Sequence, residues 1–286
     1  MFLDEIYISP AKINLYLQVL GKLPDGYHDL DSMVAILNLH DELQFSLSDT
    51  NSVLTNGGEF ASKVPNFDAN IISKVVAEFN KIKPFKLATK ITKNIPISAG
   101  LGGGSSNAAA AMVYLNKALQ LNYDLPKLID IGIKIGADIP LFLHWHFTGN
   151  PVFKFAGKGE QIIDVDDYSA LTNMQILLVN PGVEVSTADV FNGLKGLGGR
   201  IQDSGLTNII NEVLAKPNDL QNTAIKIAPK IDNVLKYISN ILGCRLARMS
   251  GSGSTCFGLF DKGVDFAPTN QSYWHILTKF ANICHN

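Results

Sequence analysis

Residues 96–107 read Pro-Ile-Ser-Ala-Gly-Leu-Gly-Gly-Gly-Ser-Ser-Asn, and this stretch decides how the rest of the sequence is interpreted. It follows a predicted strand at 88–91 and leads into the small-residue run 105–112, which predicts a helix packed closely on a sheet. Glycines let the main chain approach a ligand, and the first N–H groups of a helix have no partners within the helix. A strand, glycine loop and helix in this order bind phosphate, whereas a glycine cluster alone is equally typical of a tight or flexible loop. The serine pair at the helix entry favours phosphate binding.

Two common nucleotide-binding loops do not fit this stretch. A P-loop has lysine and then serine or threonine after its last glycine, whereas Ser105 and Ser106 follow Gly104 here. A dinucleotide-binding loop needs a glycine where Ser105 stands. Both motifs are therefore disfavoured.

Polar residues near the N-terminus share one face of a predicted strand. Residues 13–19 alternate between apolar and polar, as a half-buried strand does. Because side chains two positions apart point the same way, Lys12 and Asn14 lie on the same face.

Two connections place further polar side chains where a ligand could meet them. The turn formers of residues 21–26 put Tyr27 and His28 on a loop. A predicted helix at 125–135 is followed closely by Asp138, which therefore stands at a helix exit.

The order of predicted elements favours a two-layer α+β fold over a doubly wound sheet, because strands and helices interleave without a regular strand-helix-strand rhythm. Near residues 149–159 the sequence pattern changes from helix to loop and strand. We therefore expect an N-terminal domain at 1–150, which carries the phosphate loop, and a C-terminal domain at 151–286.

Composition limits the classes of function. A chain of 286 residues with 46% hydrophobic residues can bury a full core. Its formal net charge of -2 is not that of a dedicated nucleic-acid-binding protein, which uses positive charge to neutralise phosphates. Three widely spaced cysteines, Cys244, Cys256 and Cys284, indicate neither a disulfide framework nor a zinc site. With acidic residues near its start and no long apolar stretch, the chain is expected to be cytoplasmic, with no membrane partner. The sequence gives no sign of its oligomeric state.

Three segments in order resemble the GHMP kinases. The glycine stretch is similar to their ATP-phosphate loop, in which proline precedes Gly-Leu-Gly and paired small polar residues. Residues 9–15 with 25–28 resemble the N-terminal motif of the branch whose acceptor carries a cytidine diphosphate group, and 249–254 resemble the third GHMP motif. Members of that branch often have further glycines directly before the position of Gly100, whereas this chain has Ser98 and Ala99 there.

The resemblance implies a two-lobed GHMP kinase fold, with the active site in the cleft between the lobes and ATP and Mg²⁺ as cofactors. It implies nucleotide contacts at Asn70, Lys93, Pro96, Gly100, Leu101, Gly102, Gly103, Gly104, Ser105, Ser106, Asn107, Gly251, Ser252 and Gly253. No protein metal site is expected. Ser105 or Ser106 is a candidate ligand of Mg²⁺, whereas His144 and His146 are interpreted as strand residues without a third partner nearby.

Such a kinase transfers the γ-phosphoryl group of ATP to an alcohol, which needs few catalytic side chains. An aspartate can accept the proton of the hydroxyl group, and a neighbouring lysine can keep that aspartate ionised. The resemblance assigns these roles to Asp138 and Lys12, with Asn14 binding substrate or holding Lys12. The alternatives from the residues alone are a turn aspartate and an exposed strand lysine.

Rings that stack and hydrogen-bond are what recognition of a cytosine requires. The resemblance assigns this task to Tyr27 and His28, with Phe191 as a second stacking ring and Thr187 as a substrate contact; the alternative is that Phe191 belongs to the core. Two other functions stay open: another GHMP kinase acting on mevalonate, homoserine or a sugar, and a nucleotide-binding sensor without turnover.

Overall fold

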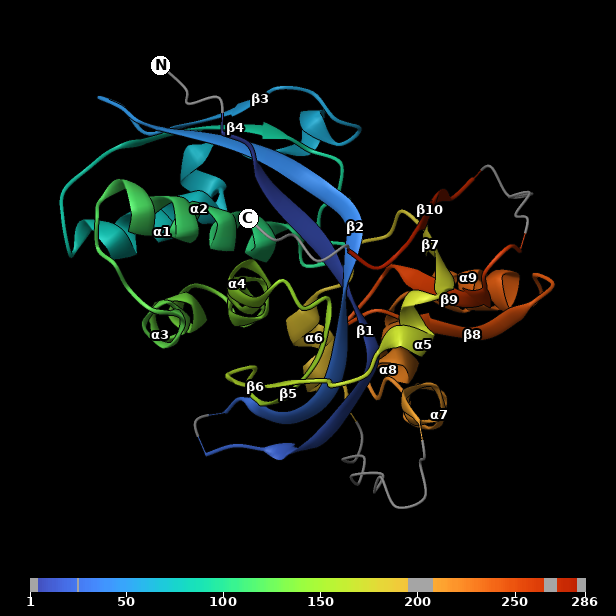
Figure 1. Cartoon of the computed structure of the whole chain (residues 1–286). Coiled ribbons are helices and arrows are strands. Elements are labelled where there is room, and N and C mark those ends of the chain that lie inside the picture. Colours follow the sequence, from blue (N-terminus) through green and yellow to red (C-terminus); the bar gives the residue numbers. More distant parts are fainter. Residues whose placement is uncertain (1–4, 25, 195–207, 265–271, 282–286) are drawn as a thin grey trace.

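The structure is a computed structural model that describes residues 5–24, 26–194, 208–264 and 272–281, and within them it has two β-sheets and several helices (Figure 1). The larger sheet has the order β3-β4-β2-β5-β6, with β1 paired to β2 beside that path. Its pairs are antiparallel except for the parallel pair β3 and β4. Its strands are β1 (Tyr7–Lys22), β2 (His28–Leu47), β3 (Ser52–Thr55), β4 (Leu87–Thr92), β5 (Val152–Gly157) and β6 (Gln161–Asp164).

The smaller sheet has the order β10-β7-β9-β8 and is antiparallel throughout. Its strands are β7 (Met174–Asn180), β8 (Cys244–Met249), β9 (Cys256–Asp261) and β10 (Trp274–Thr278). The helices of the described residues are α1 (Ile71–Asn80), α2 (Gly103–Ala118), α3 (Leu125–Ile135), α4 (Ile139–Thr148), α5 (Ser169–Thr172), α6 (Thr187–Asn192), α7 (Ile209–Ala215), α8 (Gln221–Ile227) and α9 (Lys230–Ser239), with short 3₁₀ turns η1 (Ala61–Lys63) and η2 (Phe67–Ala69).

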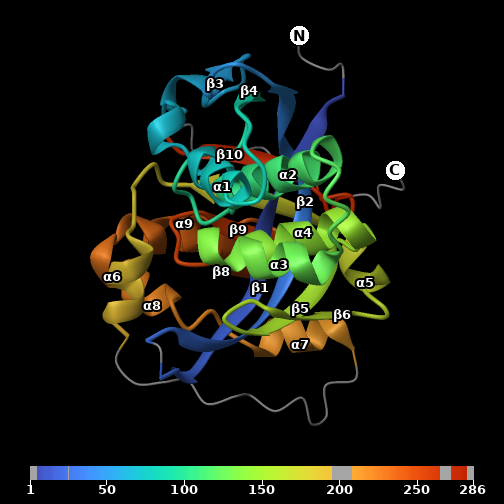
Figure 2. The same ribbon diagram turned by 90° about the vertical axis from the view of Figure 1, so that its left-hand side faces the viewer.

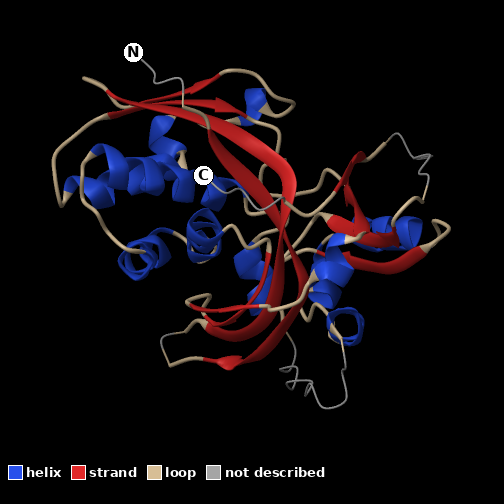
Figure 3. Cartoon of the chain, viewed as in Figure 1, coloured by secondary structure: helices blue, strands red, loops and turns tan. Residues whose placement is uncertain are grey.

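The long strands β1 and β2 run between the two lobes. Helices α1 to α4 lie on one side of them, and the smaller sheet with α8 and α9 lies on the other (Figures 1 and 3). The face that carries α1 to α4 is turned to the viewer in Figure 2. This arrangement confirms the predicted α+β, two-lobed fold. The hairpin of β5 and β6 pairs with β2 although it follows residue 150, and the division between 1–150 and 151–286 stays a prediction.

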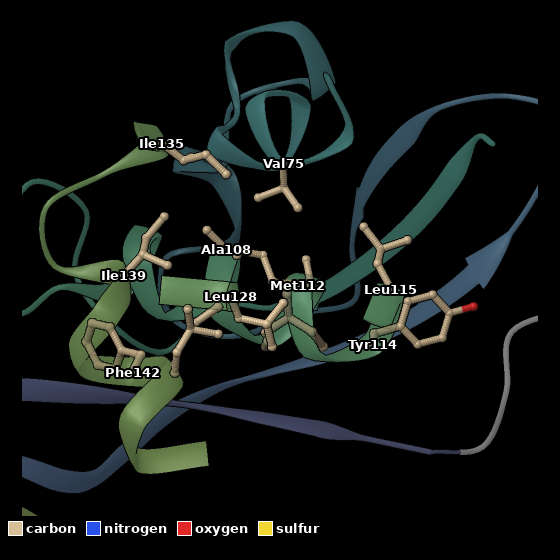
Figure 4. Close-up of a cluster of buried hydrophobic side chains, with 14 of the residues drawn as sticks. Val75, Ala108, Met112, Tyr114, Leu115, Leu128, Ile135, Ile139 and Phe142 are labelled. Atoms are coloured by element: carbon tan, nitrogen blue, oxygen red, sulfur yellow. The ribbon is translucent and has the colours of Figure 1, made fainter. Parts of the chain in front are cut away.

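Helix α2 is the centre of the N-terminal core because its side chains are small. Residues 108–111 are four consecutive alanines, all fully buried, so the helix axis comes close to its neighbours. Larger side chains from the surrounding helices fill the space around it (Figure 4), among them Val75, Leu128, Ile139 and Phe142. The packing thereby holds the start of α2 in place, where the glycine loop enters the helix.

His144 and His146 lie on helix α4, so their interpretation as strand residues is wrong. A short apolar run does not distinguish a buried helix from a strand, and here Pro140 occupies the first turn of a helix that is buried on most sides. Every helix in the described part of the chain is too short or too polar to cross a bilayer. Cys244 and Cys256 are free thiols, and Cys284 lies outside the described residues.

The substitution Leu115→Ala is expected to lower the free energy of unfolding by about 2–5 kcal/mol, because Leu115 is fully buried on α2 and its removal leaves a cavity. Urea unfolding followed by circular dichroism measures the loss. Lys117→Ala on the same helix is the control, and it should change the free energy by less than about 0.5 kcal/mol because the Lys117 side chain is 72% exposed. Equal effects of the two changes would contradict the packing role of α2.

Candidate active site

The glycine loop opens onto a cavity of about 960 Å³ that residues from both lobes surround. Every site residue predicted from the sequence lines it except two, Leu101 and Ser106, which are buried beneath it. The predicted residues that line it are Lys12, Asn14, Tyr27, His28, Asn70, Lys93, Pro96, Gly100, Gly102, Gly103, Gly104, Ser105, Asn107, Asp138, Thr187, Phe191, Gly251, Ser252 and Gly253. Segments far apart in the sequence thus converge on one site.

The glycine loop has a main-chain conformation that side chains would oppose. Gly100 and Gly102 have φ values of +77° and +72°, and Ser98 has a φ of +54° although it is not glycine. A Cβ atom at Gly102 would lie 2.7 Å from the ring of Phe142. Because Gly102 is the N-cap residue of α2 and has no side chain to cap the helix, the first N–H groups of α2 are available to an anion.

Residues 249–254, the third glycine motif, close against this loop through Ser250 and the adjacent Thr255. Ser250 Oγ donates a hydrogen bond of 3.0 Å to the carbonyl oxygen of Gly100 and accepts one of 3.3 Å from the N–H of Asn14. The N–H of Thr255 donates to the carbonyl oxygen of Ala99 at 3.1 Å. These contacts bring β1, the glycine loop and the third motif together.

Lys12, Asn14 and Asp138 form a hydrogen-bonded and charged group at the cavity wall. The Nζ atom of Lys12 donates to Asn14 Oδ1 at 2.7 Å and lies 3.5 Å from Asp138 Oδ2. The Lys12 side chain is 4% exposed and that of Asp138 is 39% exposed. Asn14 in turn donates to Ser32 Oγ at 3.0 Å, so its amide oxygen is oriented toward the lysine. The ammonium group thus lies beside the carboxylate of Asp138, which still faces the cavity.

A second buried lysine lies close to the start of α2. Lys93 Nζ donates to Asp41 Oδ2 at 2.5 Å, and the other oxygen of this fully buried carboxylate accepts from the N–H groups of Asn94 and Ile95. Burial lowers the pKa of the Lys93 ammonium, and the charge of Asp41 opposes that shift. Asp41 was not predicted from the sequence. Its signal was its alternation with Leu39 and Leu43, because residues two apart on a strand share one face.

Aromatic rings gather at another part of the cavity wall. The rings of His28 and Phe191 stack, with centroids 4.7 Å apart and planes inclined by 28°. Burial, with a smaller contribution from the charge of Lys22, lowers the pKa of His28. Tyr27 is 58% exposed, and Lys158 Nζ lies 5.2 Å from the centroid of its ring. Thr187 Oγ1 lies 2.7 Å from Ser252 Oγ.

Some lining residues carried no sequence signal. Apolar side chains beside Asn70 give part of the cavity an apolar wall, namely Val64, Pro65, Ile71 and Ile91. Asn70 itself caps α1, because its Oδ1 accepts from the N–H of Ile72. Lys158 was also missed, since a lone lysine in a turn is usually a solvated charge.

The two histidines of α4 stand apart from this cavity. His144 Nε2 pairs with Asp164 Oδ1 at 2.8 Å, and burial lowers the pKa of His146 to about 4. Within the described ranges there is no group of three or more His, Cys, Asp or Glu side chains that could hold a metal ion.

Known proteins resemble this chain in sequence and in structure. The model of the GHMP kinases N terminal domain matches residues 70–145, and that of the GHMP kinases C terminal domain matches residues 204–266. The 4-diphosphocytidyl-2-C-methyl-D-erythritol kinase of Brucella melitensis biotype 1 is 37% identical over 266 residues, which is 88% of this chain and 85% of that protein. The kinase of the same name from Roseobacter denitrificans is 38% identical over 88% of this chain and 83% of its own.

Solved structures share the fold. A crystal structure of 4-(cytidine 5'-diphospho)-2C-methyl-D-erythritol kinase has a TM-score of 0.72 and 25% identity, and covers 97% of this chain and 100% of its own. Homoserine kinase from Cytophaga hutchinsonii and mevalonate kinase from Methanococcus jannaschii both have TM-scores of 0.64 over 97% of this chain. They cover 94% and 98% of their own chains at 15% and 13% identity, so they show the fold alone. The chain belongs to the GHMP kinase family, in the branch of the 4-diphosphocytidyl-2-C-methyl-D-erythritol kinases.

Proposed function

We propose that this protein transfers the γ-phosphoryl group of ATP to the 2-hydroxyl group of 4-diphosphocytidyl-2-C-methyl-D-erythritol, in the non-mevalonate formation of isoprenoid precursors. The observation that carries the proposal is that one cavity holds the Lys12 and Asp138 pair, the exposed start of α2 and the rings of His28 and Phe191. The names of the most similar curated relatives support the choice of acceptor.

The nucleotide is proposed to lie between α1 and α2. Its phosphates would accept hydrogen bonds from the first N–H groups of α2, where the helix dipole also favours negative charge. The buried ammonium of Lys93 lies near Gly103 and adds positive charge to the same region. The apolar wall beside Asn70 fits the flat face of an adenine.

Magnesium fits the site mainly through the phosphates of ATP, because the described side chains offer no cluster of acidic ligands. Ser105 lines the cavity, and the buried Ser106 Oγ has no hydrogen-bond partner among the described residues, so either hydroxyl could complete its coordination. When bound, the ion would neutralise charge on the β- and γ-phosphates.

Asp138 is proposed to accept the proton of the acceptor hydroxyl, since its carboxylate is the exposed member of the pair. The ammonium charge of Lys12 would attract the oxygens of the transferred group. Asn14 would hold the ammonium in place, because its amide oxygen accepts from Lys12 and its amide nitrogen is tied to Ser32.

The cytosine of the acceptor is proposed to stack on the rings of Tyr27, His28 and Phe191, while Thr187 contacts the acceptor chain. The stacked rings of His28 and Phe191 leave no room for a base between them, because their separation is that of a single stacked pair. The base would therefore part these two rings or stack on an outer face, where the exposed Tyr27 could cover it.

Three other points stay proposals: a cytoplasmic location, the absence of nucleic-acid and membrane partners, and the domain division between 1–150 and 151–286. None of them alters the assignment of the acceptor.

The acceptor is tested by ADP release from ATP and magnesium with four alcohols supplied separately. We expect turnover with 4-diphosphocytidyl-2-C-methyl-D-erythritol and none with mevalonate, homoserine or galactose, because these three lack a base to stack. Turnover with one of them instead would support another GHMP kinase activity. ATP binding without any turnover would support a nucleotide sensor.

Asp138→Asn is expected to lower kcat by about 10²–10⁴-fold, because the amide cannot accept the hydroxyl proton. The dissociation constant for ATP, measured by calorimetry, should stay within about twofold, since the change leaves the glycine loop intact. Asp130→Asn on α3 is the control, because Asp130 is exposed and does not line the cavity. An unchanged kcat in the Asp138 variant would remove this residue as the base.

Phe191→Ala is expected to raise the acceptor KM roughly tenfold, because base–aromatic stacking contributes about 1–3 kcal/mol. The KM for ATP should not change. Phe147→Ala, which removes an exposed ring of α4 outside the cavity, serves as the control. If the acceptor KM of the Phe191 variant matched that of the control, the stacking role would be wrong.

A further inference from the structure

A short segment of the C-terminal lobe, residues 217–219, pairs with β1, the strand that carries the proposed catalytic lysine. The N–H of Leu17 on β1 donates to the carbonyl oxygen of Pro217 at 3.0 Å, and the N–H of Asp219 donates to the carbonyl oxygen of Leu17 at 2.9 Å. Leu17 and Asn218 form a parallel bridge through these two bonds. These hydrogen bonds fix the position of Asn218 relative to β1, the strand that carries Lys12 and Asn14.

The side chain of Asn218 connects this point to the third glycine motif. Its Nδ2 atom donates to the carbonyl oxygens of Met249 and Gly251, both at 2.8 Å, and its Oδ1 atom accepts from the N–H of Leu220 at 3.0 Å. The residue is 5% exposed, so both amide hydrogens are used inside the protein.

Gly251 lies directly against the proposed catalytic group. A Cβ atom on Gly251 would come within 3.3 Å of Lys12 Nζ and 3.4 Å of Asn14 Oδ1. A displacement of this residue would therefore change the packing around the lysine and the shape of the phosphate end of the cavity, which Gly251 lines.

The segment before Asn218 is anchored by buried charges, so it can serve as a fixed support. Lys216 is 1% exposed, and its Nζ atom lies 2.9 Å from Glu212 Oε1 and 3.8 Å from Asp31 Oδ2 on β2. Lys154 Nζ of β5 lies 2.8 Å from the same Glu212 oxygen. Buried charges with this many partners resist displacement, because breaking one pair leaves an uncompensated charge.

We propose that Asn218 is a positioning residue that holds the third glycine motif in register with Lys12 and the glycine loop. It does not line the cavity and acts through Gly251. Its loss would remove a donor from each of two buried carbonyl oxygens, and the loop would move to recover hydrogen bonds. The role rests on the proposed kinase function, in which Gly251, Ser252 and Gly253 of this motif line the cavity that takes ATP.

The proposal is tested with the purified full chain and the variants Asn218→Asp and Asn218→Ala. Asn218→Asp keeps the size of the side chain and the acceptor for Leu220, but replaces the double donor with a carboxylate oxygen. We expect it to lower kcat/KM for ATP by about 10- to 100-fold, because a displacement near 1 Å in a catalytic site has an effect of that size. The acceptor KM should stay within about twofold.

Asn116→Ala is the matched control. Asn116 also makes two side-chain hydrogen bonds to main chain, to the carbonyl oxygen and from the N–H of Tyr123, both at 2.9 Å, but it lies outside the cavity. It should lower the melting temperature by a similar amount without changing either KM. An effect of the Asn218 variants on melting temperature alone, or the same kinetic loss in the control, would overturn the positioning role.

Two further outcomes are decisive. If Asn218→Asp does not fold, Asn218→Ala decides in the same assays. If the wild-type protein does not phosphorylate the cytidine-bearing acceptor, the proposed function fails, and the positioning role is judged from the dissociation constant for ATP alone. A weakening of at least about tenfold in the Asn218 variants and none in the control would support it.

Discussion

The close approach of two glycine loops is the constraint on which the rest of the structure depends. A Cβ atom at Gly100 would lie 2.6 Å from the carbonyl oxygen of Ser250 and 2.8 Å from that of Gly253. Only main chain without side chains can meet in this way, and Gly100 and Gly253 also have positive φ values. Because the two loops belong to different lobes, their contact sets the distance between the lobes and hence the shape of the cavity.

The positive charge in the cavity comes from a few oriented groups and not from a basic surface. The formal net charge of the chain is -2, yet the buried ammonium groups of Lys12 and Lys93 and the start of α2 face the same space. A buried ammonium is tolerated only when it has partners, and Asn14 with Asp138 and Asp41 supply them. Such paired charges concentrate positive charge in one place although the net charge of the chain is slightly negative.

The family fold separates the binding of the phosphoryl donor from the choice of acceptor. Homoserine and mevalonate kinases share the fold at low identity, so the architecture alone does not select an alcohol. In this chain α2 sits in the core of the N-terminal lobe, whereas Tyr27 lies in the turn before β2, His28 begins β2 and Phe191 lies on the short helix α6. Loops on a rigid scaffold can change their side chains without disturbing the core, which explains how one fold accepts different alcohols.

The sequence by itself determined the local parts of this protein. The strand at 13–19, the glycine stretch before α2, the extent of α3 and the place of Asp138 after α3 were all predicted, because each depends on neighbouring residues. The expectation that this strand is half-buried was wrong, because both faces of β1 are covered and Lys12, Asn14 and Gln18 are buried. The sequence motifs also indicated the residues that line the cavity, since residues that contact a common ligand carry recognisable patterns. Tertiary structure alone decided the partners of the buried charges, such as Asp41 for Lys93, and the bridge from Leu17 to Asn218. It also decided that the run with His144 and His146 is a helix and that β5 and β6 extend the larger sheet. These features depend on contacts between residues far apart in the chain. A local sequence pattern does not show which distant segment will pair with a buried charge, an open sheet edge or an unpaired carbonyl oxygen.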